Sequence, residues 1–352
     1  MDDKPSTPRK PRIHSLWQEF RELTLPSSSY SSPAVDRLHS PPSPLHFLRR
    51  FISQNKPCLI TNSISHFPAL SLWSSPSYLS SALSSSSVSV QLTPTGLADS
   101  PTLLPDGGGL CFASPHALRL PFPDALELIV SGRRDRGLVA YAQAQDDCFR
   151  KDGGGFDAIR IDVDDEIPWM SEAMGSFPDA VNIWIGNGES ATWFHKDHYE
   201  NLYAVICGEK RFTLIPPCEF HRMYVREYPA AEYVYSEDTG DFELRLEEPK
   251  RQVPWCSVDP YPSPEDLERM KREFPLYFNG PKPIEVTVKA GEMLYLPSMW
   301  FHHVQQNGDE RGGLAVAVNY WYDMQFDIKY AYFNFLQSIQ VEQESEELLS
   351  AD

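Results

Sequence analysis

Short apolar stretches, many of them alternating with polar positions, recur along most of the chain. Successive side chains of a strand leave the backbone on opposite faces, so this pattern predicts β-strands. The predicted strands cover residues 57–61, 88–92, 138–143, 181–186, 202–207, 284–288 and 314–322. Two further apolar stretches that contain histidines, residues 189–217 and 291–306, add to the sheet. The pattern therefore predicts a mainly β protein.

Helical spacing of apolar residues marks both ends of the strand-rich region. Near the start, Ile13, Trp17 and Phe20 repeat at the helical period and predict a helix over residues 13–25. Shorter helices are predicted at residues 47–52, 123–130 and 263–274, whereas the serine-rich residues 71–87 and the chain after Pro217 are predicted to be irregular. At the end, one helical face is predicted to carry Ile328, Tyr332, Phe335 and Ile339. Such a face must be covered, either by the sheet or by a second copy of the chain.

The charge balance narrows the choice of partners. The chain has 31 lysine and arginine residues against 49 aspartate and glutamate residues, a net charge of −18. Nucleic acids and anionic membranes bind basic surfaces, so we expect neither as a partner, while basic protein partners remain compatible. No apolar stretch approaches the roughly 20 residues that span a bilayer.

The cysteines indicate the compartment. Six are scattered singly without a CxxC pair, which favours reduced thiols in a reducing compartment. We therefore expect a cytoplasmic protein, with the nucleus as an alternative because residues 9–12 read RKPR.

The candidate metal-ligating and binding residues are concentrated in residues 189–217. His195 and Asp197 stand two positions apart in a β-rich context, so both side chains leave the strand on one face. Ferrous iron in an oxygenase is held by two neutral imidazoles and one carboxylate, with the opposite positions open. The second imidazole comes from the adjacent pair His302 and His303, and strand alternation alone leaves open which of the two it is, because Pro297 interrupts the stretch.

A candidate receptor for a small dicarboxylate accompanies the candidate metal ligands. Lys210 follows His195 by fifteen residues, Thr192 precedes it by three and Tyr203 follows it by eight. A buried carboxylate must be neutralised and hydrogen-bonded, and an ammonium with two hydroxyls meets both needs. The stretch therefore predicts a metal and a co-substrate held together.

These residues stand in segments that resemble the jumonji-C family of iron- and 2-oxoglutarate-dependent oxygenases, and within it the lysyl hydroxylases. The segments that carry the resemblance are DAVNIWIGNGESATWFHKDHYENLYAVICGEK, GEMLYLPSMWFHHVQQ and AVNYWYDMQFDIKYAYF, with further matches at NKPCLITNSISHFPAL and VSVQLTPTGLADS. The likeness extends over most of residues 12–340. It implies a double-stranded β-helix, the cupin-type barrel of that family, with an N-terminal helical region and a C-terminal helix.

The resemblance also implies roles for individual residues. It selects His302, with His195 and Asp197, as the Fe(II) ligands, and it assigns Tyr141 to the 2-oxoglutarate pocket besides Lys210, Thr192 and Tyr203. Asn319 would line that pocket or stand behind the residues that do. The cofactors implied by the resemblance would be Fe(II), 2-oxoglutarate and dioxygen. Its substrate would be a lysine side chain, hydroxylated at C3, in GTP-binding proteins of the developmentally regulated class, and its C-terminal helix would mildly favour a homodimer.

With this resemblance the chain divides into five predicted parts. These are a disordered start (1–12), an N-terminal helical and strand region packed on the barrel (13–130), the catalytic barrel (131–326), a C-terminal helix (327–341) and an acidic tail (342–352). The acidic, proline-containing residues 232–283 would be a local elaboration. An acidic loop, residues 146–168, is a candidate to hold a substrate lysine or arginine near the metal.

Other readings of the same residues stay open. A demethylase acting on histone tails would use the same iron site and differ only in its pocket. A metal-dependent endopeptidase acting on histone tails would need a metal-activated water and a general base. The chain has no HExxH motif, and Lys210 has no task in proteolysis. A cupin-fold binding protein without catalysis is the third alternative.

Overall fold

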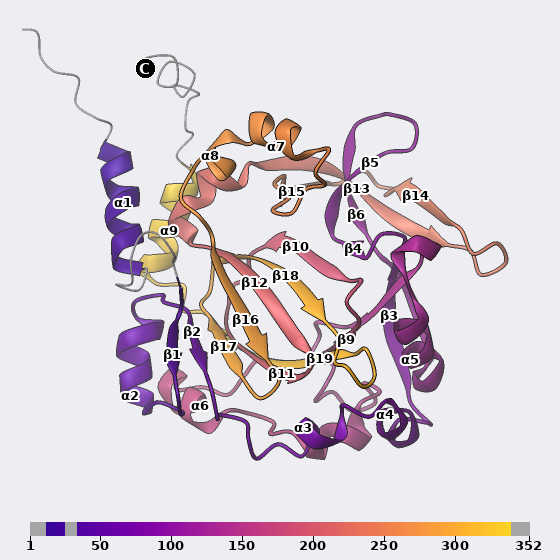
Figure 1. The fold of residues 1–352 in the computed structure, drawn as a ribbon. Helices are drawn as coiled ribbons and strands as arrows, with labels where there is room; N and C mark the ends of the chain where they lie inside the picture. Colours follow the sequence, from indigo (N-terminus) through magenta and orange to yellow (C-terminus); the bar gives the residue numbers. More distant parts are fainter. Residues whose placement is uncertain (1–11, 25–33, 339–352) are drawn as a thin grey trace, which may run out of the picture.

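Two β-sheets that share one core organise the computed structural model, which describes residues 12–24 and 34–338 (Figure 1). The larger sheet has nine strands in the order β1 (Asp36–Leu38), β2 (Cys58–Ile60), β17 (Met293–Leu296), β11 (Tyr199–Cys207), β19 (Ala315–Asp323), β9 (Ala180–Gly186), β8 (Val139–Gln143), β3 (Ser87–Thr93) and β7 (His116–Pro121). The smaller sheet has the order β16 (Ile284–Lys289), β12 (Glu209–Ile215), β18 (Phe301–Asn307), β10 (Ala191–His195) and β4 (Leu97–Ala98). The chain is therefore a double-stranded β-helix, as its sequence predicts.

A layer of large side chains fills the space between the two sheets. It combines residues of the larger sheet, such as Trp184 and Leu294, with residues of the smaller sheet, such as Phe212 and Val286. The outer face of the larger sheet packs against a second, larger core under the helices. Every residue of β9 is consequently buried, whereas β16 alternates between buried and accessible positions. A strand covered on both faces is apolar throughout, and a strand covered on one face alternates.

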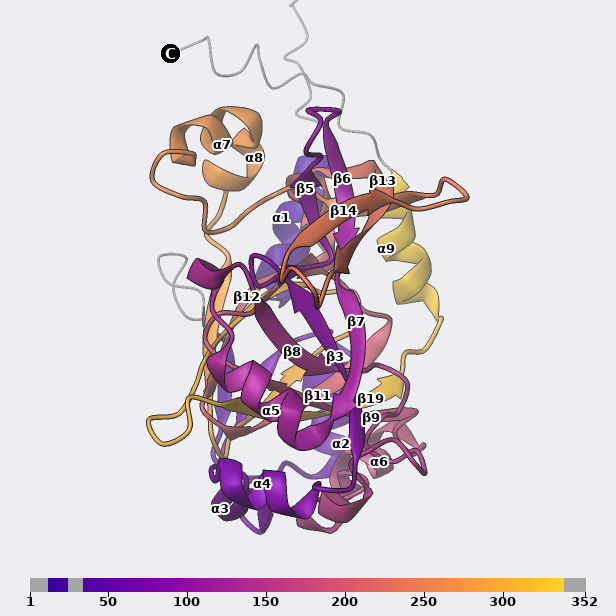
Figure 2. The same ribbon diagram turned by 90° about the vertical axis from the view of Figure 1, so that its right-hand side faces the viewer.

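A third sheet stands beside the opening of the barrel (Figure 2). It has the order β14 (Phe242–Leu246), β13 (Val225–Tyr235), β6 (Leu110–Ser114) and β5 (Ser100–Leu103), and β15 (Gln252–Cys256) also pairs with β13. Strand β4 leads into β5 after a single residue, Asp99, so this sheet continues directly from the edge of the smaller one.

The helices lie on the outside of the sheets. They are α1 (Arg12–Thr24), α2 (Pro44–Phe47), α3 (Ala69–Leu72), α4 (Pro76–Ala82), α5 (Phe122–Ser131), α6 (Pro168–Met174), α7 (Leu267–Glu273), α8 (Pro275–Phe278) and α9 (Ile328–Ser338), with shorter helical segments η1 (Leu48–Ile52), η2 (Arg134–Arg136), η3 (Asp157–Asp162) and η4 (Pro217–Met223). The first and last helices of the described residues, α1 and α9, both pack on η4 (Figure 1). Trp17, Cys218 and Leu336 form the small core between them.

Most predicted elements are confirmed. Strands are found at each of the seven predicted ranges, and helices at residues 12–24, 44–52 and 122–131 match the predicted ones within a few residues. The helix predicted at 263–274 begins only at Leu267, because Ser263 accepts a hydrogen bond from the amide of Asp266 and forms a turn first. All six cysteines are free and buried.

Two predictions are wrong. The serine-rich residues 71–87 contain α4, which Ser75 begins by accepting a hydrogen bond from the amide of Tyr78, with proline in the first turn. The chain after Pro217 is not irregular, since it contains the long strand β13, whose parallel partner β6 lies far away in the sequence. Such a pairing leaves no local signal.

The predicted apolar face of the C-terminal helix is not the face that packs on the barrel, so its burial by a second copy of the chain stays a prediction. The structure buries Phe333 and Leu336, while Ile328 and Phe335 are exposed. The helix lies on the core formed with Met299 and Met324, and the position of that core decides which face is covered. Ile339 and the predicted acidic tail lie outside the described residues.

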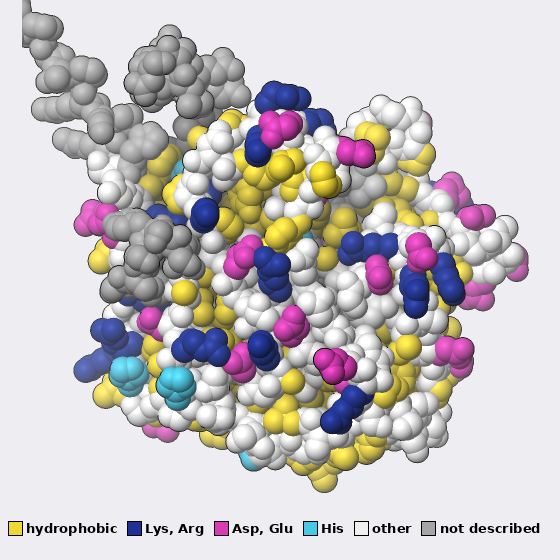
Figure 3. Space-filling model, viewed as in Figure 1, with side chains coloured by type: hydrophobic (Ala, Val, Ile, Leu, Met, Phe, Trp, Pro, Cys, Tyr) yellow, Lys and Arg dark blue, Asp and Glu magenta, His cyan; other side chains and the backbone are white. Residues whose placement is uncertain are grey.

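The surface carries charged side chains of both signs together with apolar side chains (Figure 3). Lysine and arginine side chains are interspersed with aspartate and glutamate over the face shown in Figure 3, and apolar side chains gather in the hollow beneath α7. Within the described residues, we find no helix with the length and apolar character needed to cross a bilayer.

Candidate active site

Two neighbouring strands of the smaller sheet place two histidines side by side. His195 ends β10 and pairs in register with His302 of β18, and their ring centroids are 4.0 Å apart. Asp197 follows in the short link to β11, with its Oδ2 3.8 Å from Nε2 of His195 and 3.6 Å from Nε2 of His302. One ligand atom from each of the three residues lies within 4.8 Å of the others. The structure thus brings together the three residues predicted to hold metal.

The backbone orients both imidazoles in the same way. Nδ1 of His195 lies 2.8 Å from the carbonyl of Trp193, and Nδ1 of His302 lies 3.1 Å from the carbonyl of Trp300. A carbonyl only accepts hydrogen bonds, so each Nδ1 carries the proton and each Nε2 presents its lone pair to the cluster. Burial, together with neighbouring His195, holds the pKa of His302 well below its usual value. The His302 imidazole is therefore neutral, as a metal ligand must be.

The donor set fits Fe(II). Two neutral imidazole nitrogens and one carboxylate on one side of a site, with the other side free of ligands, are typical of non-haem iron oxygenases. Asp197 is held in place through its backbone, because its carbonyl accepts a hydrogen bond from the amide of Met299. Met299 adopts a left-handed conformation with φ of 69°, which turns the chain between β17 and β18 toward this link.

Lys210 of β12 is buried inside the barrel without a counter-ion. Only 1% of the residue is exposed, and its ammonium donates hydrogen bonds to the hydroxyl of Tyr141 (2.9 Å) and to the amide oxygen of Gln306. Burial lowers the pKa of Lys210 from 10.5 to about 7. No carboxylate among the described residues offsets this cost. A buried cation without a counter-ion is suited to bind an anion.

Two tyrosines and a threonine accompany this lysine. The hydroxyl of Tyr203 lies next to that of Tyr141, and burial raises the pKa of both phenols, so both remain hydrogen-bond donors. The ammonium of Lys210 lies 5.1 Å from the ring centre of Tyr141 and 6.0 Å from that of Tyr203. Thr192 of β10 lines a small cavity together with Tyr141. The structure therefore brings these four predicted residues into one region of the barrel.

Asn319 has a different position from the one expected of a direct pocket contact. Its amide oxygen accepts a hydrogen bond from the indole of Trp184 (2.8 Å), and its amide nitrogen donates to Asn201 (3.3 Å). Asn319 is fully buried in β19. It fixes Trp184, whose ring lies 6.2 Å from that of Tyr141 and 6.4 Å from that of Tyr203, and so acts behind the pocket.

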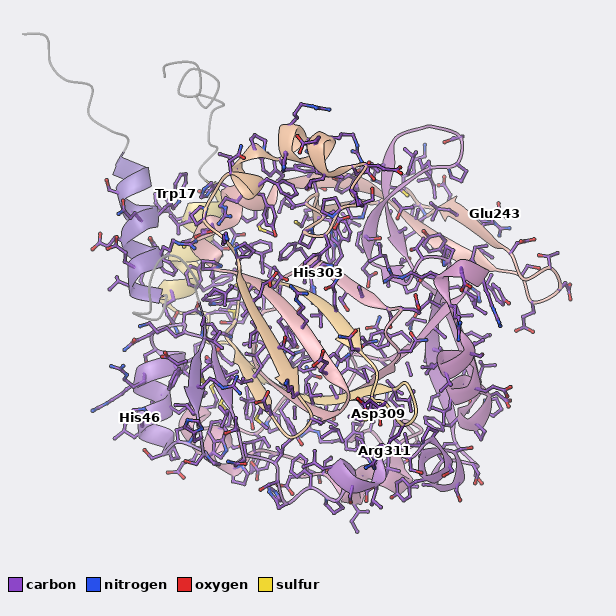
Figure 4. The ribbon with its side chains drawn as sticks, in the orientation of Figure 1. Trp17, His46, Glu243, His303, Asp309 and Arg311 are labelled. Carbon is purple, nitrogen blue, oxygen red and sulfur yellow. The ribbon has the colours of Figure 1, made fainter. Side chains whose placement is uncertain are left out.

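The other histidines near the triad belong to different surroundings. His303 points away from His302 and lies among the rings of Trp193, Phe194 and Tyr261, at the end of the smaller sheet nearest α7 (Figure 4). Burial lowers the pKa of His303 to about 3, so it is a neutral core residue. His198 lies against Phe326 outside the cluster.

The sequence reasoning missed two residues that shape the pocket. Gln306 accepts from Lys210 and donates to the carbonyl of Asn187 and the hydroxyl of Ser190. It stands four positions after His302, an even spacing that places both on one face of β18, so strand alternation could have found it. Gly186 is the second, because a Cβ there would meet Gln306 at 2.3 Å and the ring of Tyr141 at 2.5 Å.

Asp99 is a third residue that the sequence did not single out. It lines the small cavity with Thr192 and Tyr141, and its φ of 53° is left-handed. Burial raises the pKa of Asp99, and nearby His195 opposes that shift. No motif surrounds Asp99, so only the pairing of β4 with β10 reveals its place beside the metal cluster.

The acidic loop at residues 146–168 is largely paired within its own region. Asp147 pairs with Arg150, Asp146 with Lys151, and Asp165 with Arg160, whose side chain forms two hydrogen bonds to that carboxylate. These cations already satisfy several of its charges. Among the described residues, this loop forms no hydrogen bond or ion pair with His195 or His302.

Comparison with known proteins agrees with this geometry. Residues 44–328 match the model of the cupin-like domain. The chain is 55% identical over 328 residues to lysine-specific demethylase JMJ32 of Arabidopsis thaliana, covering 93% of this chain and 91% of that protein. It is 39% identical over 328 residues to the human bifunctional peptidase and (3S)-lysyl hydroxylase JMJD7, covering 93% and 96% respectively. JmjC domain-containing protein E of Dictyostelium discoideum is 34% identical over 318 residues, which cover 86% of this chain and 88% of that one.

Relatives of this kind are 2-oxoglutarate-dependent oxygenases that generally use Fe(II) and act on protein substrates. The matches extend over nearly the whole chain, and the barrel, the His-Asp-His cluster and the buried lysine occupy the matched region. The protein belongs to the jumonji-C family of cupin-like oxygenases.

Proposed function

We propose that this protein is an Fe(II)- and 2-oxoglutarate-dependent lysyl hydroxylase, which adds oxygen at C3 of a lysine in GTP-binding proteins of the developmentally regulated class. The observation that carries the iron and co-substrate part is the His195, Asp197 and His302 cluster inside the same barrel as an unpaired, buried Lys210. The (3S)-lysyl hydroxylase named among the relatives supports the choice of lysine and of C3.

In the proposed mechanism the protein residues bind, orient and exclude water. His195, Asp197 and His302 would hold the iron, and Lys210 would neutralise the far carboxylate of 2-oxoglutarate. The hydroxyls of Tyr141, Tyr203 and Thr192 would donate to that co-substrate, and Asn319 would keep the pocket in shape through Trp184. When bound, iron would activate dioxygen with 2-oxoglutarate as the electron donor, so that one oxygen atom would enter the succinate formed with loss of carbon dioxide and the other would enter the unactivated C–H bond of the substrate. The buried walls keep competing water away from the reaction.

Lysine demethylation is the second candidate, because a relative with 55% identity is named a lysine-specific demethylase. It needs the same iron and co-substrate but places an N-methyl carbon at the metal. Peptide hydrolysis has support only in the name of the human relative. Hydrolysis would not use Lys210, and a binding protein without catalysis would not use the cluster of metal-ligating residues.

One experiment separates these reactions. The purified protein is incubated with ferrous iron, 2-oxoglutarate and two matched peptides, one with lysine and one with trimethyllysine, and the products are measured by fragment-ion mass spectrometry. Hydroxylation adds one oxygen to lysine, demethylation removes a methyl group with formation of formaldehyde, and hydrolysis shortens the peptide without 2-oxoglutarate. Asp197→Ala is the control that removes the metal site. Oxidised lysine in that variant would contradict the assignment of the ligands.

Association and location are part of the same proposal. Ile328 and Phe335 of α9 are exposed apolar residues, and we propose that they form a homodimer contact. Sedimentation of the wild type and of Phe335→Glu would test it, since a dimer should dissociate in the variant.

We propose a cytoplasmic protein that also reaches the nucleus, and a fluorescent fusion would test this.

A further inference from the structure

We propose that Asp99 binds the ammonium group of the substrate lysine. This inference rests on the proposed lysine-directed function and adds the residue that selects the side chain. Asp99 is distinct from the iron ligands, because it belongs to no group of metal-ligating atoms found in the described residues.

The pairing of strands places Asp99 beside the reaction centre. Strand β4 runs parallel to β10, with Leu97 opposite Ala191 and Ala98 opposite Thr192. Asp99 is the next residue, so it advances along β10 from Thr192 toward His195. It lines the same small cavity as Thr192. Asp99 therefore lies beside the co-substrate pocket, and its carboxylate is close enough to His195 for the two charges to interact.

The local backbone is arranged for this placement. Asp99 has φ of 53°, a left-handed conformation that interrupts the regular alternation between β4 and β5. Aspartate and asparagine tolerate this conformation better than most residues. Non-glycine residues in such conformations cluster at functional sites, where the surrounding structure holds them.

Among the described residues, no lysine or arginine forms an ion pair or hydrogen bond with Asp99, and the charged side chain that acts on it is that of His195. His195 is neutral when it binds metal, so it cannot serve as the counter-ion. Asp99 is only partly accessible to solvent, and a carboxylate that is partly shielded from water without a partner is stabilised when a cation binds.

The charges of the loaded site lead to the same conclusion. The divalent metal and Lys210 together carry three positive charges, and Asp197 and dianionic 2-oxoglutarate carry three negative charges. The site is then neutral without Asp99. The additional carboxylate gives it an excess negative charge, which the ammonium of a lysine side chain cancels.

The position also suits hydroxylation at C3 better than demethylation. The C3 atom of lysine is four bonds away from its ammonium nitrogen, so a C3 atom at the metal leaves the ammonium at a neighbouring group outside the coordination sphere. An N-methyl carbon at the metal would instead bring the nitrogen next to the metal itself. Asp99 lies beside the cluster but outside it, as the first arrangement requires.

A binding experiment without turnover tests the inference. Holoprotein is prepared with Mn(II) and 2-oxoglutarate under nitrogen, and its affinity is measured by calorimetry for two peptides that differ only in lysine against norleucine. The wild type should bind the lysine peptide about tenfold or more tightly, because charge-assisted hydrogen bonds are roughly twice as strong as neutral ones. Asp99→Asn should lose this preference and keep its fold, since asparagine suits the same backbone conformation. Asp106→Asn, an exposed carboxylate in the β5–β6 turn, should keep the preference.

Each result decides between the alternatives. Retained preference for lysine in Asp99→Asn, or no preference in the wild type, would overturn the role of Asp99. Line broadening by Mn(II) gives an independent reading: the Cβ protons of lysine should broaden more than the Cε protons, and the reverse order would also overturn it. If ferrous wild type consumes no 2-oxoglutarate, the proposed oxygenase function fails. A lysine preference that disappears in Asp99→Asn would still support the binding role.

Discussion

Replacing Lys210 by methionine should make the protein without co-substrate more stable while weakening its affinity for 2-oxoglutarate. Lysine and methionine have similar length, so the variant removes the charge and leaves little cavity. Lowering the pKa of Lys210 from 10.5 to about 7 corresponds to about 5 kcal/mol at about 1.4 kcal/mol per pH unit. The loss of hydrogen bonds to Tyr141 and Gln306 reduces the gain by about 1 to 3 kcal/mol, because their polar atoms stay buried.

The stability gained by Lys210→Met should depend on pH, in a direction set by the lowered pKa of Lys210. Below pH 7 the lysine is protonated in both folded and unfolded protein, and the folded state bears the full cost of burying the charge. Between pH 7 and 10.5 the unfolded state binds more protons than the folded state, so the stability of the wild type rises with pH. The advantage of Lys210→Met should therefore be largest below pH 7 and shrink toward pH 10.5.

Chemical unfolding of both proteins without 2-oxoglutarate, at several pH values from 6 to 9, measures the difference directly. Lys289→Met, a change at an exposed lysine of β16, is the control and should alter the free energy of unfolding by less than about 0.5 kcal/mol. A Lys210→Met protein that is less stable at pH 6, with no dependence on pH, would refute the reasoning from burial. The affinity of the wild type for 2-oxoglutarate should also fall about tenfold per pH unit above pH 7, because the anion binds the protonated lysine.

Three further substitutions test separate parts of the structure. Asp197→Ala should retain its circular dichroism spectrum and lose metal affinity by more than the roughly 10–100-fold that an outer partner costs, as measured by calorimetry with Mn(II). Gly186→Ala should weaken 2-oxoglutarate binding by about 1 to 3 kcal/mol with metal affinity unchanged, because its Cβ would displace Gln306 and Tyr141. Glu219→Ala should lower the free energy of unfolding by about 3 to 5 kcal/mol, since Glu219 neutralises the buried Arg222 in η4, and a smaller loss in urea unfolding would contradict this.

Local patterns in the sequence were enough to predict a mainly β protein and the pair of ligands His195 and Asp197, whereas the barrel was implied by the resemblance to the jumonji-C family. The i, i+2 spacing of His195 and Asp197 is a property of one short segment. The choice of His302 over His303 needed the resemblance, and in the structure His303 does face the aromatic cluster around Trp193. Lys210 was predicted from its chemistry, and its lack of a counter-ion became visible only in the folded barrel.

The parts that the sequence could not predict depend on contacts between distant segments. Strand β13 pairs with β6 about a hundred residues earlier, and its charged residues and Pro229 give it little sign of a strand. The buried face of α9 is set by the core around Met299 and Met324 rather than by its apolar stripe. Asp99 stands in a segment without a motif, and its significance arises from the pairing of β4 with β10.

The hydrogen bonds of the two histidines have a consequence for how this protein can change. Each imidazole uses the carbonyl two residues before it in the chain, so main-chain atoms, which no substitution removes, hold both rings. In many metal sites a carboxylate side chain has this task, and its loss weakens the site. The residues around the iron site can therefore be substituted while main-chain hydrogen bonds still orient both histidines. Selectivity for a new substrate can therefore evolve at Asp99 and its neighbours without disturbing the metal centre.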